Sequence, residues 1–207
     1  MTIARWTVLG GLVALTWAIA LRSWMTHLAF QFDTWPVYTW EGTFLAILAP
    51  AVVVGALIGW DHGSRLNGAG RHRWIGWSPL MLVIGPALLA DNFIGTLMET
   101  GEGGGAIGVV VLGLSGGWAI SGRGANWSRW VLGGLALIIL GSMTYGFYLA
   151  DPPFTSGDAF GALFLAVLMV WLGLGCSLPM RPEEIPQNRN GLRTDERSLE
   201  ISESKRQ

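Results

Sequence analysis

The charged residues of this chain are distributed very unevenly, and their distribution limits the folds that it can adopt. Twelve of the 27 Lys, Arg, Asp and Glu residues follow Pro179, where fewer than thirty residues remain. The preceding 178 residues hold only fifteen charges, while 51% of the whole sequence is hydrophobic. Because about a quarter of the residues of an average soluble domain are charged, this stretch cannot cover a surface exposed to water. The sequence therefore predicts a membrane domain over residues 1–178 and a disordered cytoplasmic tail over residues 179–207.

Cutting the membrane domain at its charges leaves six apolar segments. A transmembrane helix needs about 20 mainly apolar residues to cross about 30 Å of hydrocarbon. The first and third segments are short unless their helices continue past Arg22 and Asp91. We therefore predict an all-α bundle of six transmembrane helices, which cover approximately residues 6–28, 43–60, 74–98, 104–121, 130–150 and 159–178.

The basic residues fall almost entirely on one side of this predicted bundle. Positively charged loops are retained in the cytoplasm. Twelve of the thirteen Lys and Arg residues precede the first segment, follow the second or fourth segment, or lie in the tail, and Arg22 is the exception. The opposite loops carry the acidic residues Asp33, Glu41, Asp91, Glu99, Glu102, Asp151 and Asp158. We expect both termini in the cytoplasm.

The N-terminal segment has one alternative interpretation. Arg5, the apolar run and Ala18-Ile19-Ala20 resemble the charged region, core and cleavage site of a signal peptide, and cleavage would leave five spans. The apolar run continues through Trp24, Met25 and Leu28, which favours an uncleaved helix. Twelve arginines against one lysine, with abundant Gly, Ala and Trp, favour a bacterial genome of high GC content, so we expect the bacterial cytoplasmic membrane.

The expected partners follow from charge and glycine spacing. The net charge of −1 gives no reason to expect nucleic acid, and the bilayer itself is the first expected partner. Glycines four residues apart let two helix backbones approach closely. Such pairs favour packing within the bundle, with another membrane protein or with a second copy of the chain; they are Gly55 and Gly59, Gly104 and Gly108, and Gly113 and Gly117.

Three motifs point formally to chemistry. Gly113-Leu114-Ser115-Gly116 in the fourth segment resembles the G-x-S-G motif of rhomboid intramembrane proteases, in which the sixth helix supplies a histidine partner. A serine nucleophile needs a base within hydrogen-bond reach, and residues 159–178 contain no histidine, so an intramembrane serine hydrolase is only a remote alternative. The glycine-rich run at residues 101–106 lacks the preceding strand of a dinucleotide site. Asp61, His62 and His72 match no metal-binding spacing, so we interpret them as solvated loop residues and expect no cofactor, metal or catalytic residues.

A wider resemblance lies in the first helix hairpin. Arg22-Ser23-Trp24-Met25 is followed by Tyr38-Thr39-Trp40-Glu41-Gly42-Thr43. This pattern resembles R-x-W-M followed by aromatic-T-W-x-G-T in small multi-span membrane proteins of actinobacterial type, a family without an assigned activity. The resemblance implies the same membrane class and no mechanism. It directs attention to the external end of the hairpin.

One candidate site lies at that external end. Arg22, Glu41 and Asp91 fall at comparable depth, so we predict an ion pair of Arg22 with Glu41 or Asp91, beside Trp24, His27 and Trp40. The alternative is an arginine whose side chain extends to the lipid headgroups without a protein partner.

The expected function is that of a non-catalytic accessory or envelope component, because the middle parts of the segments carry no ionisable group. The alternative is a small transporter or channel with an acidic external mouth. Pro79 and Pro86 favour it by interrupting the third helix. So does the match of four in six positions between residues 17–22 and 118–123, three spans apart, since inverted repeats occur in transporters.

Overall fold

The computed structural model describes residues 2–31, 38–69, 72–89, 104–150 and 155–181, and every regular element within them is helical. The prediction of an all-α fold is confirmed for these residues. Within the described residues, four stretches are long and apolar enough to cross a membrane, namely Ile3–His27, Trp40–Leu66, Asn126–Tyr145 and Ser156–Met180. The elements are α1 (Ile3–Gln31), η1 (Trp40–Leu48), α2 (Ala49–Leu66), η2 (Arg73–Leu80), α3 (Met81–Leu89), α5 (Gly104–Ile120), α6 (Asn126–Ala150), α7 (Ser156–Ser177) and η3 (Leu178–Met180).

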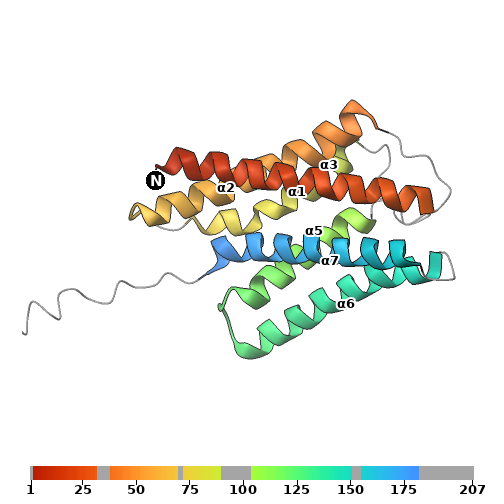
Figure 1. The fold of residues 1–207 in the computed structure, drawn as a ribbon. Coiled ribbons are helices and arrows are strands. Elements are labelled where there is room, and N and C mark those ends of the chain that lie inside the picture. Colours follow the sequence, from red (N-terminus) through yellow and green to blue (C-terminus); the bar gives the residue numbers. More distant parts are fainter. Residues whose placement is uncertain (1, 32–37, 70–71, 90–103, 151–154, 182–207) are drawn as a thin grey trace, which may run out of the picture.

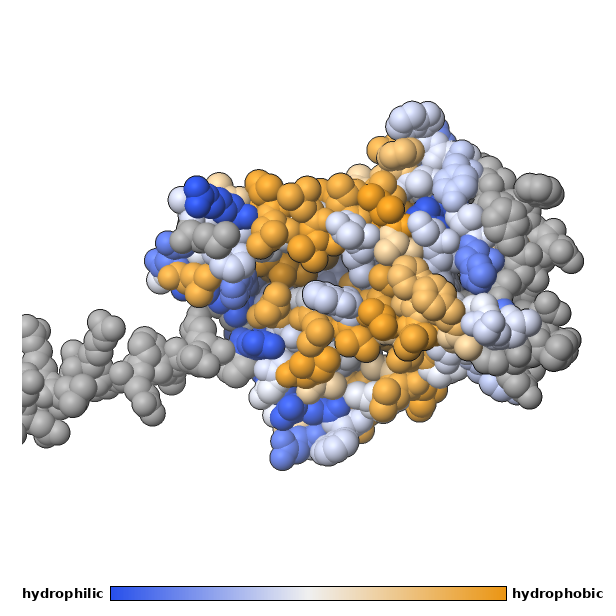
Figure 2. Space-filling view, viewed as in Figure 1, coloured by the Kyte–Doolittle hydropathy of each residue, from blue (hydrophilic) through white to orange (hydrophobic). Residues whose placement is uncertain are grey.

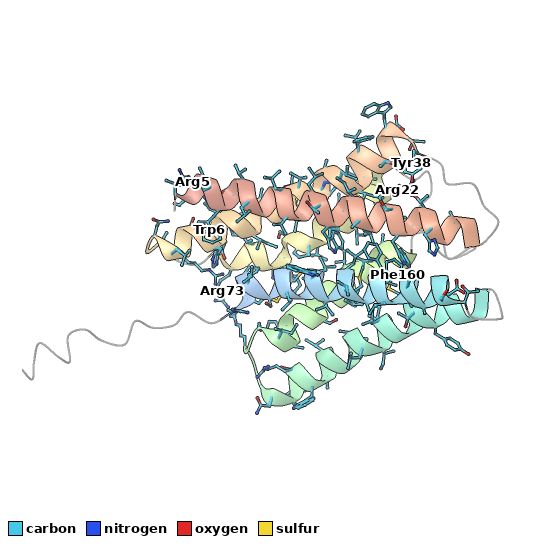
Figure 3. All side chains as sticks on the ribbon, in the orientation of Figure 1. Arg5, Trp6, Arg22, Tyr38, Arg73 and Phe160 are labelled. Carbon is cyan, nitrogen blue, oxygen red and sulfur yellow. The ribbon has the colours of Figure 1, made fainter. Side chains whose placement is uncertain are left out.

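The helices lie side by side along one axis, with α7 between the α1–α2 hairpin and α6 (Figure 1). The N-terminus, the last turn of α2, the turn between α5 and α6 and the end of α7 lie at one end of the bundle. Arg5 and Arg73 also lie there, so we call it the basic end, whereas Arg22 lies towards the opposite end (Figure 3). Hydrophobic side chains cover the middle of the visible surface, as expected of a protein surrounded by lipid (Figure 2).

The second helix begins irregularly, and a proline explains why. Pro50 has no backbone N–H, and its ring excludes the carbonyl of Ala46 four residues before it. The helix widens in response: η1 is π-helical, and the backbone N–H of Ala49 donates to Phe44 O, five residues back. The Ala46 carbonyl faces α3, where a Cβ on Gly85 would overlap it. Segments η1 and α2 therefore form one helix that bends around α3.

The contact between α1 and α2 is made by small residues on both helices. A Cβ on Gly59 would overlap the carbonyl oxygen of Trp6, and one on Gly55 would overlap both Gly10 O and Ala14 Cβ. The backbones therefore touch, as the Gly55–Gly59 spacing indicates. We call this contact the α1–α2 seam; it comprises Trp6, Gly10 and Ala14 of α1 and Gly55, Gly59 and Gly63 of α2.

The contact between α5 and α7 is looser. A Cβ on Gly113 would lie 2.9 Å from Leu172 Cδ2, and one on Gly117 would lie 2.7 Å from Cys176 Cβ. Gly113 thus faces only side chains of α7, whereas a Cβ on Gly117 would also lie 3.0 Å from the backbone carbonyl carbon of Cys176. A buried apolar cluster continues from this contact towards α1, and it comprises Leu21, Leu112, Leu165, Leu168 and Met169.

Local signals set the helix ends. Thr155 precedes α7 and forms a capping box with Asp158: the Thr155 hydroxyl lies 2.7 Å from the Asp158 carboxylate and accepts the Asp158 N–H at 3.3 Å. Gly68 follows α2 with φ +80°, a conformation that other residues rarely adopt. The start of α7 and the end of α2 are therefore set by local sequence, as expected where the chain turns at the ends of a bundle.

Candidate functional site

A buried ionic cluster lies at the basic end, around Asp61. Asp61 is 1% exposed in the last turns of α2 and forms an ion pair with Arg65, one turn further along. Its other carboxylate oxygen accepts the backbone N–H of His72 at 3.1 Å. Arg65 also donates to the carbonyl oxygens of Leu178 at 3.3 Å and Pro179 at 3.0 Å. The cluster thus ties α2 to the start of η2 and to the chain after α7.

The sequence interpretation of this cluster was wrong in one respect. We expected Asp61 to be a solvated loop residue after a helix that ended at residue 60, whereas α2 continues to Leu66 and buries Asp61. His72 lies with Nδ1 3.6 Å from Asp61, but His62 instead contacts Trp6 edge to face, with ring centroids 4.8 Å apart. The four-residue spacing of Asp61 and Arg65, which suits a pair on one helix face, was the signal that could have revealed the cluster.

The chemistry of the Asp61 cluster suits a structural role, in which it holds α2 to the start of η2 and to the chain after α7. Among the residues that the structure describes, no group of three His, Cys, Asp or Glu side chains could hold a metal ion. Arg65 already has three oxygen partners, and Asp61 has Arg65 and His72. A buried carboxylate satisfied in this way stabilises the arrangement of the elements that it joins.

The predicted external cluster is only partly assembled. The Nε of Arg22 donates to the hydroxyl of Thr43 at 3.5 Å, and its guanidinium lies 4.5 Å from the centre of the Tyr38 ring. Glu41 is exposed in the first turn of η1. Asp91 lies outside the described residues, so the ion pair with Glu41 or Asp91 stays a prediction.

The aromatic residues predicted to accompany Arg22 point in different directions. Trp24 turns towards α7, where its indole N–H donates to Gly161 O at 3.2 Å. Trp40 is 78% exposed and stacks on Phe44, with ring centroids 4.5 Å apart. His27 is exposed on the last turns of α1. The structure does not gather Trp24 and Trp40 into one wall of a site.

The pattern that carries the family resemblance forms a corner between α1 and η1. Arg22, from its first part, contacts Tyr38 and Thr43 from its second part. Thr39 caps η1 by accepting the Gly42 N–H at 2.9 Å, and a Cβ on Gly42 would lie 2.7 Å from the Thr39 hydroxyl. A structural role therefore accounts for the residue types at these positions.

Two tryptophans of α1 join the hairpin to the rest of the bundle, and we did not predict this. The indole N–H of Trp17 donates to Leu168 O at 2.8 Å, just as Trp24 donates to Gly161 O. Both the donors and the acceptors are seven residues apart. Two antiparallel helices repeat their contacts at this interval, so the spacing of the tryptophans was a usable signal.

Ser115 and Cys176 take no part in a catalytic arrangement within the described residues. The Ser115 hydroxyl is buried and donates to Val111 O, 2.6 Å away in its own helix. Cys176 is buried against Gly117 and has no disulfide. Both are consistent with packing.

One feature that could hold a ligand is an apolar groove between α1, α2 and α7, with a volume of about 580 Å³. This volume falls within the range of small-molecule sites. The surface over α1 and α7, which bounds the groove, is mainly hydrophobic in Figure 2. The walls include Val13 and Trp17 of α1, Ile58 of α2, and Leu168, Trp171 and Gly175 of α7.

Comparison with known proteins adds no family to this description: no family model, curated protein or solved structure matches the chain. The site must therefore be interpreted from its own chemistry.

Proposed function

We propose that this chain is a non-catalytic component of the bacterial cytoplasmic membrane that binds a lipid acyl chain in the groove between α1, α2 and α7. The observation that carries the proposal is the apolar lining of a groove of about 580 Å³ whose walls belong to three candidate membrane spans. A groove at this depth is open to hydrocarbon and not to water.

The polar groups in the groove support an apolar occupant. The hydroxyl of Thr16 donates to Leu12 O at 3.0 Å, and the indole N–H of Trp17 donates to Leu168 O. His62 stands at one end, against Trp6. Because Thr16 and Trp17 donate within the protein, these two side chains offer an occupant mainly dispersion and hydrophobic contact.

The six-span topology with cytoplasmic termini belongs to the same proposal. The N-terminus and the end of α7 lie at the same end of the bundle, which an even number of crossings requires (Figure 1). The other two crossings would be η2 with α3, and α5, whose 17 residues extend about 26 Å. Arg5 and Arg73 at the basic end support placing that end in the cytoplasm.

The test uses a glycine that opens the groove. A Cβ on Gly175 has no neighbour within 4 Å, so Gly175→Phe fills the groove without a backbone clash, and Gly141→Phe on α6 is the matched control outside it. In nanodiscs, a phosphatidylcholine with a diazirine on its acyl chain should label Val13 and Leu168, and excess unlabelled lipid should compete. We expect Gly175→Phe to abolish this competable labelling and Gly141→Phe to preserve it. Labelling that does not saturate, or that survives in Gly175→Phe, would contradict the proposal.

Transport is the second candidate, and one observation favours it. The short helix η2 contains Pro79, and the buried hydroxyl of Ser78 has no hydrogen-bond partner among the described residues. Interrupted helices with unsatisfied polar groups line substrate sites in transporters. Solute or ion flux into proteoliposomes that Ser78→Ala abolishes would establish transport; we expect no flux above that of protein-free vesicles.

A further inference from the structure

A second groove, of about 640 Å³, lies on the other side of α7, between α5, α6 and α7. It shares no lining residue with the first groove. Glycines form part of each wall, and a Cβ on Gly134 of α6 would meet nothing within 4 Å. The apolar part of the lining includes Leu112, Ile120, Leu137, Leu140, Met169 and Val170.

A cationic side chain stands at one end of this groove. Arg129 lies in the first turn of α6, and its Nε donates to Ala119 O in the last turn of α5 at 3.1 Å. Within the described part of the chain, this is the only hydrogen bond of its guanidinium, so its two terminal nitrogens keep their donors. A guanidinium held in this way presents a fork that suits a phosphate.

The neighbourhood of Arg129 is also positively charged. At the basic end the described residues include Arg5, Arg65, Arg73 and Arg123 besides Arg129, and the one acidic residue described there is Asp61. Asp61 is already paired with Arg65. A basic membrane boundary attracts anionic lipid headgroups.

The dimensions and charge of the groove fit a single kind of occupant. From Arg129 to Leu140 the groove follows α6 for about 16 Å, at about 1.5 Å per residue. It therefore joins a cation at the membrane boundary to an apolar channel that runs along the helices, and Trp130, exposed beside Arg129, suits the headgroup level. A soluble anion would bind the Arg129 guanidinium and leave the apolar channel empty.

We propose that this groove binds one anionic phospholipid, with the lipid phosphate on the guanidinium of Arg129 and an acyl chain along Gly134. The site is independent of the groove assigned above, because α7 presents different faces to the two grooves. Failure of one assignment therefore leaves the other standing.

The test compares lipids that share acyl chains and differ in charge. Detergent-purified protein is titrated with phosphatidylglycerol or phosphatidylcholine, and the bound lipid is counted by native mass spectrometry. We expect about fivefold tighter binding of phosphatidylglycerol, the gain typical of one basic residue near a membrane surface. Arg129→Gln should remove this preference, and Arg129→Lys should keep most of it. Arg123→Gln, in the neighbouring turn, should leave more of it than Arg129→Gln does.

Three outcomes would overturn the assignment of the headgroup to Arg129. One is equal binding of the two lipids to the unmodified protein. Another is a preference that persists in Arg129→Gln. The third is displacement of phosphatidylglycerol by inorganic phosphate at equal concentration, which would identify a soluble-anion site.

A second pair of variants tests the position of the acyl chain. Gly134→Phe, which fills the apolar channel, should weaken the binding of both lipids, whereas Gly141→Phe should weaken the binding of neither. Unchanged lipid binding in Gly134→Phe would place the acyl chain elsewhere.

Discussion

Helices α2 and α6 both carry several glycines, but the structure uses them differently. Gly55, Gly59 and Gly63 of α2 all face α1, where a side chain would strike the partner helix. Gly134 and Gly141 of α6 face nothing within 4 Å. The first set brings two backbones into contact, and Gly134 instead opens a groove. In a membrane, where apolar side chains gain little by leaving lipid, a glycine therefore stabilises the fold only where another helix meets it.

The largest expected effect on the free energy of unfolding comes from adding a methyl group to a glycine that touches the backbone of another helix. Gly59→Ala forces α1 away from α2, because its Cβ overlaps the Trp6 carbonyl, and should cost about 3 kcal/mol. Gly113→Ala meets the flexible end of Leu172 and should cost under about 1 kcal/mol. Gly141→Ala should be neutral or stabilise the protein by about 0.5 kcal/mol, since alanine favours the helix.

The single cysteine reports this series. Cys176 is buried, so its reaction with a thiol dye on heating measures opening of the bundle. Equal melting temperatures for the Gly59→Ala and Gly141→Ala proteins would mean that the α1–α2 seam is not as close as the structure shows.

The next-largest effect is expected at the basic end, where Arg65 and Arg129 have different partners. Arg65 is paired with Asp61, whereas Arg129 has no acidic partner among the described residues. Asp61→Asn leaves the Arg65 charge uncompensated and should cost about 2 kcal/mol. Glu41→Gln, which changes an exposed carboxylate in the same way, is the control and should change the melting temperature little. Similar losses in the two variants would show that the Asp61 cluster is solvated.

A smaller effect is expected where the α1–α2 hairpin meets α7. Trp17→Phe removes an indole donor to Leu168 O and should cost about 1 kcal/mol, the usual size of one interhelical hydrogen bond in a membrane. Trp127→Phe, at an exposed position of α6, should cost less. The measurement is again the temperature at which Cys176 reacts. A larger loss for Trp127 would mean that the outward face of α6 is covered by another helix.

The sequence predicted the features that depend on composition and local order. Charge distribution indicated the helical membrane class, and the Gly55–Gly59 spacing indicated a close helix contact. It did not reveal which glycines are partnered, because Gly134 and Gly59 look alike until the neighbouring helix is placed. Asp61 was missed because a charge was taken as the end of a span, although an ion pair one helical turn long lets the helix continue past it. The grooves were missed because each arises where three helices meet, which the pattern along a single helix does not specify.

The smallest expected effect is at Arg22, at the opposite end of the hairpin from the Asp61 cluster. Arg22 contacts Tyr38 and Thr43. Because Glu41 is exposed, an ion pair between Arg22 and Glu41 would contribute under about 1 kcal/mol to the free energy of unfolding. Arg22→Glu and Glu41→Arg should each lower the melting temperature in detergent slightly, and the double variant should recover part of the loss. The same cycle with Asp91→Arg distinguishes the two predicted partners. If stability recovers in the cycle with Asp91→Arg and not in the cycle with Glu41→Arg, the partner of Arg22 is Asp91. Additive losses in both cycles would mean that Arg22 is held by Tyr38 and the headgroups and has no ion-pair partner at Glu41 or Asp91. An ion pair would then stabilise the hairpin only at its basic end.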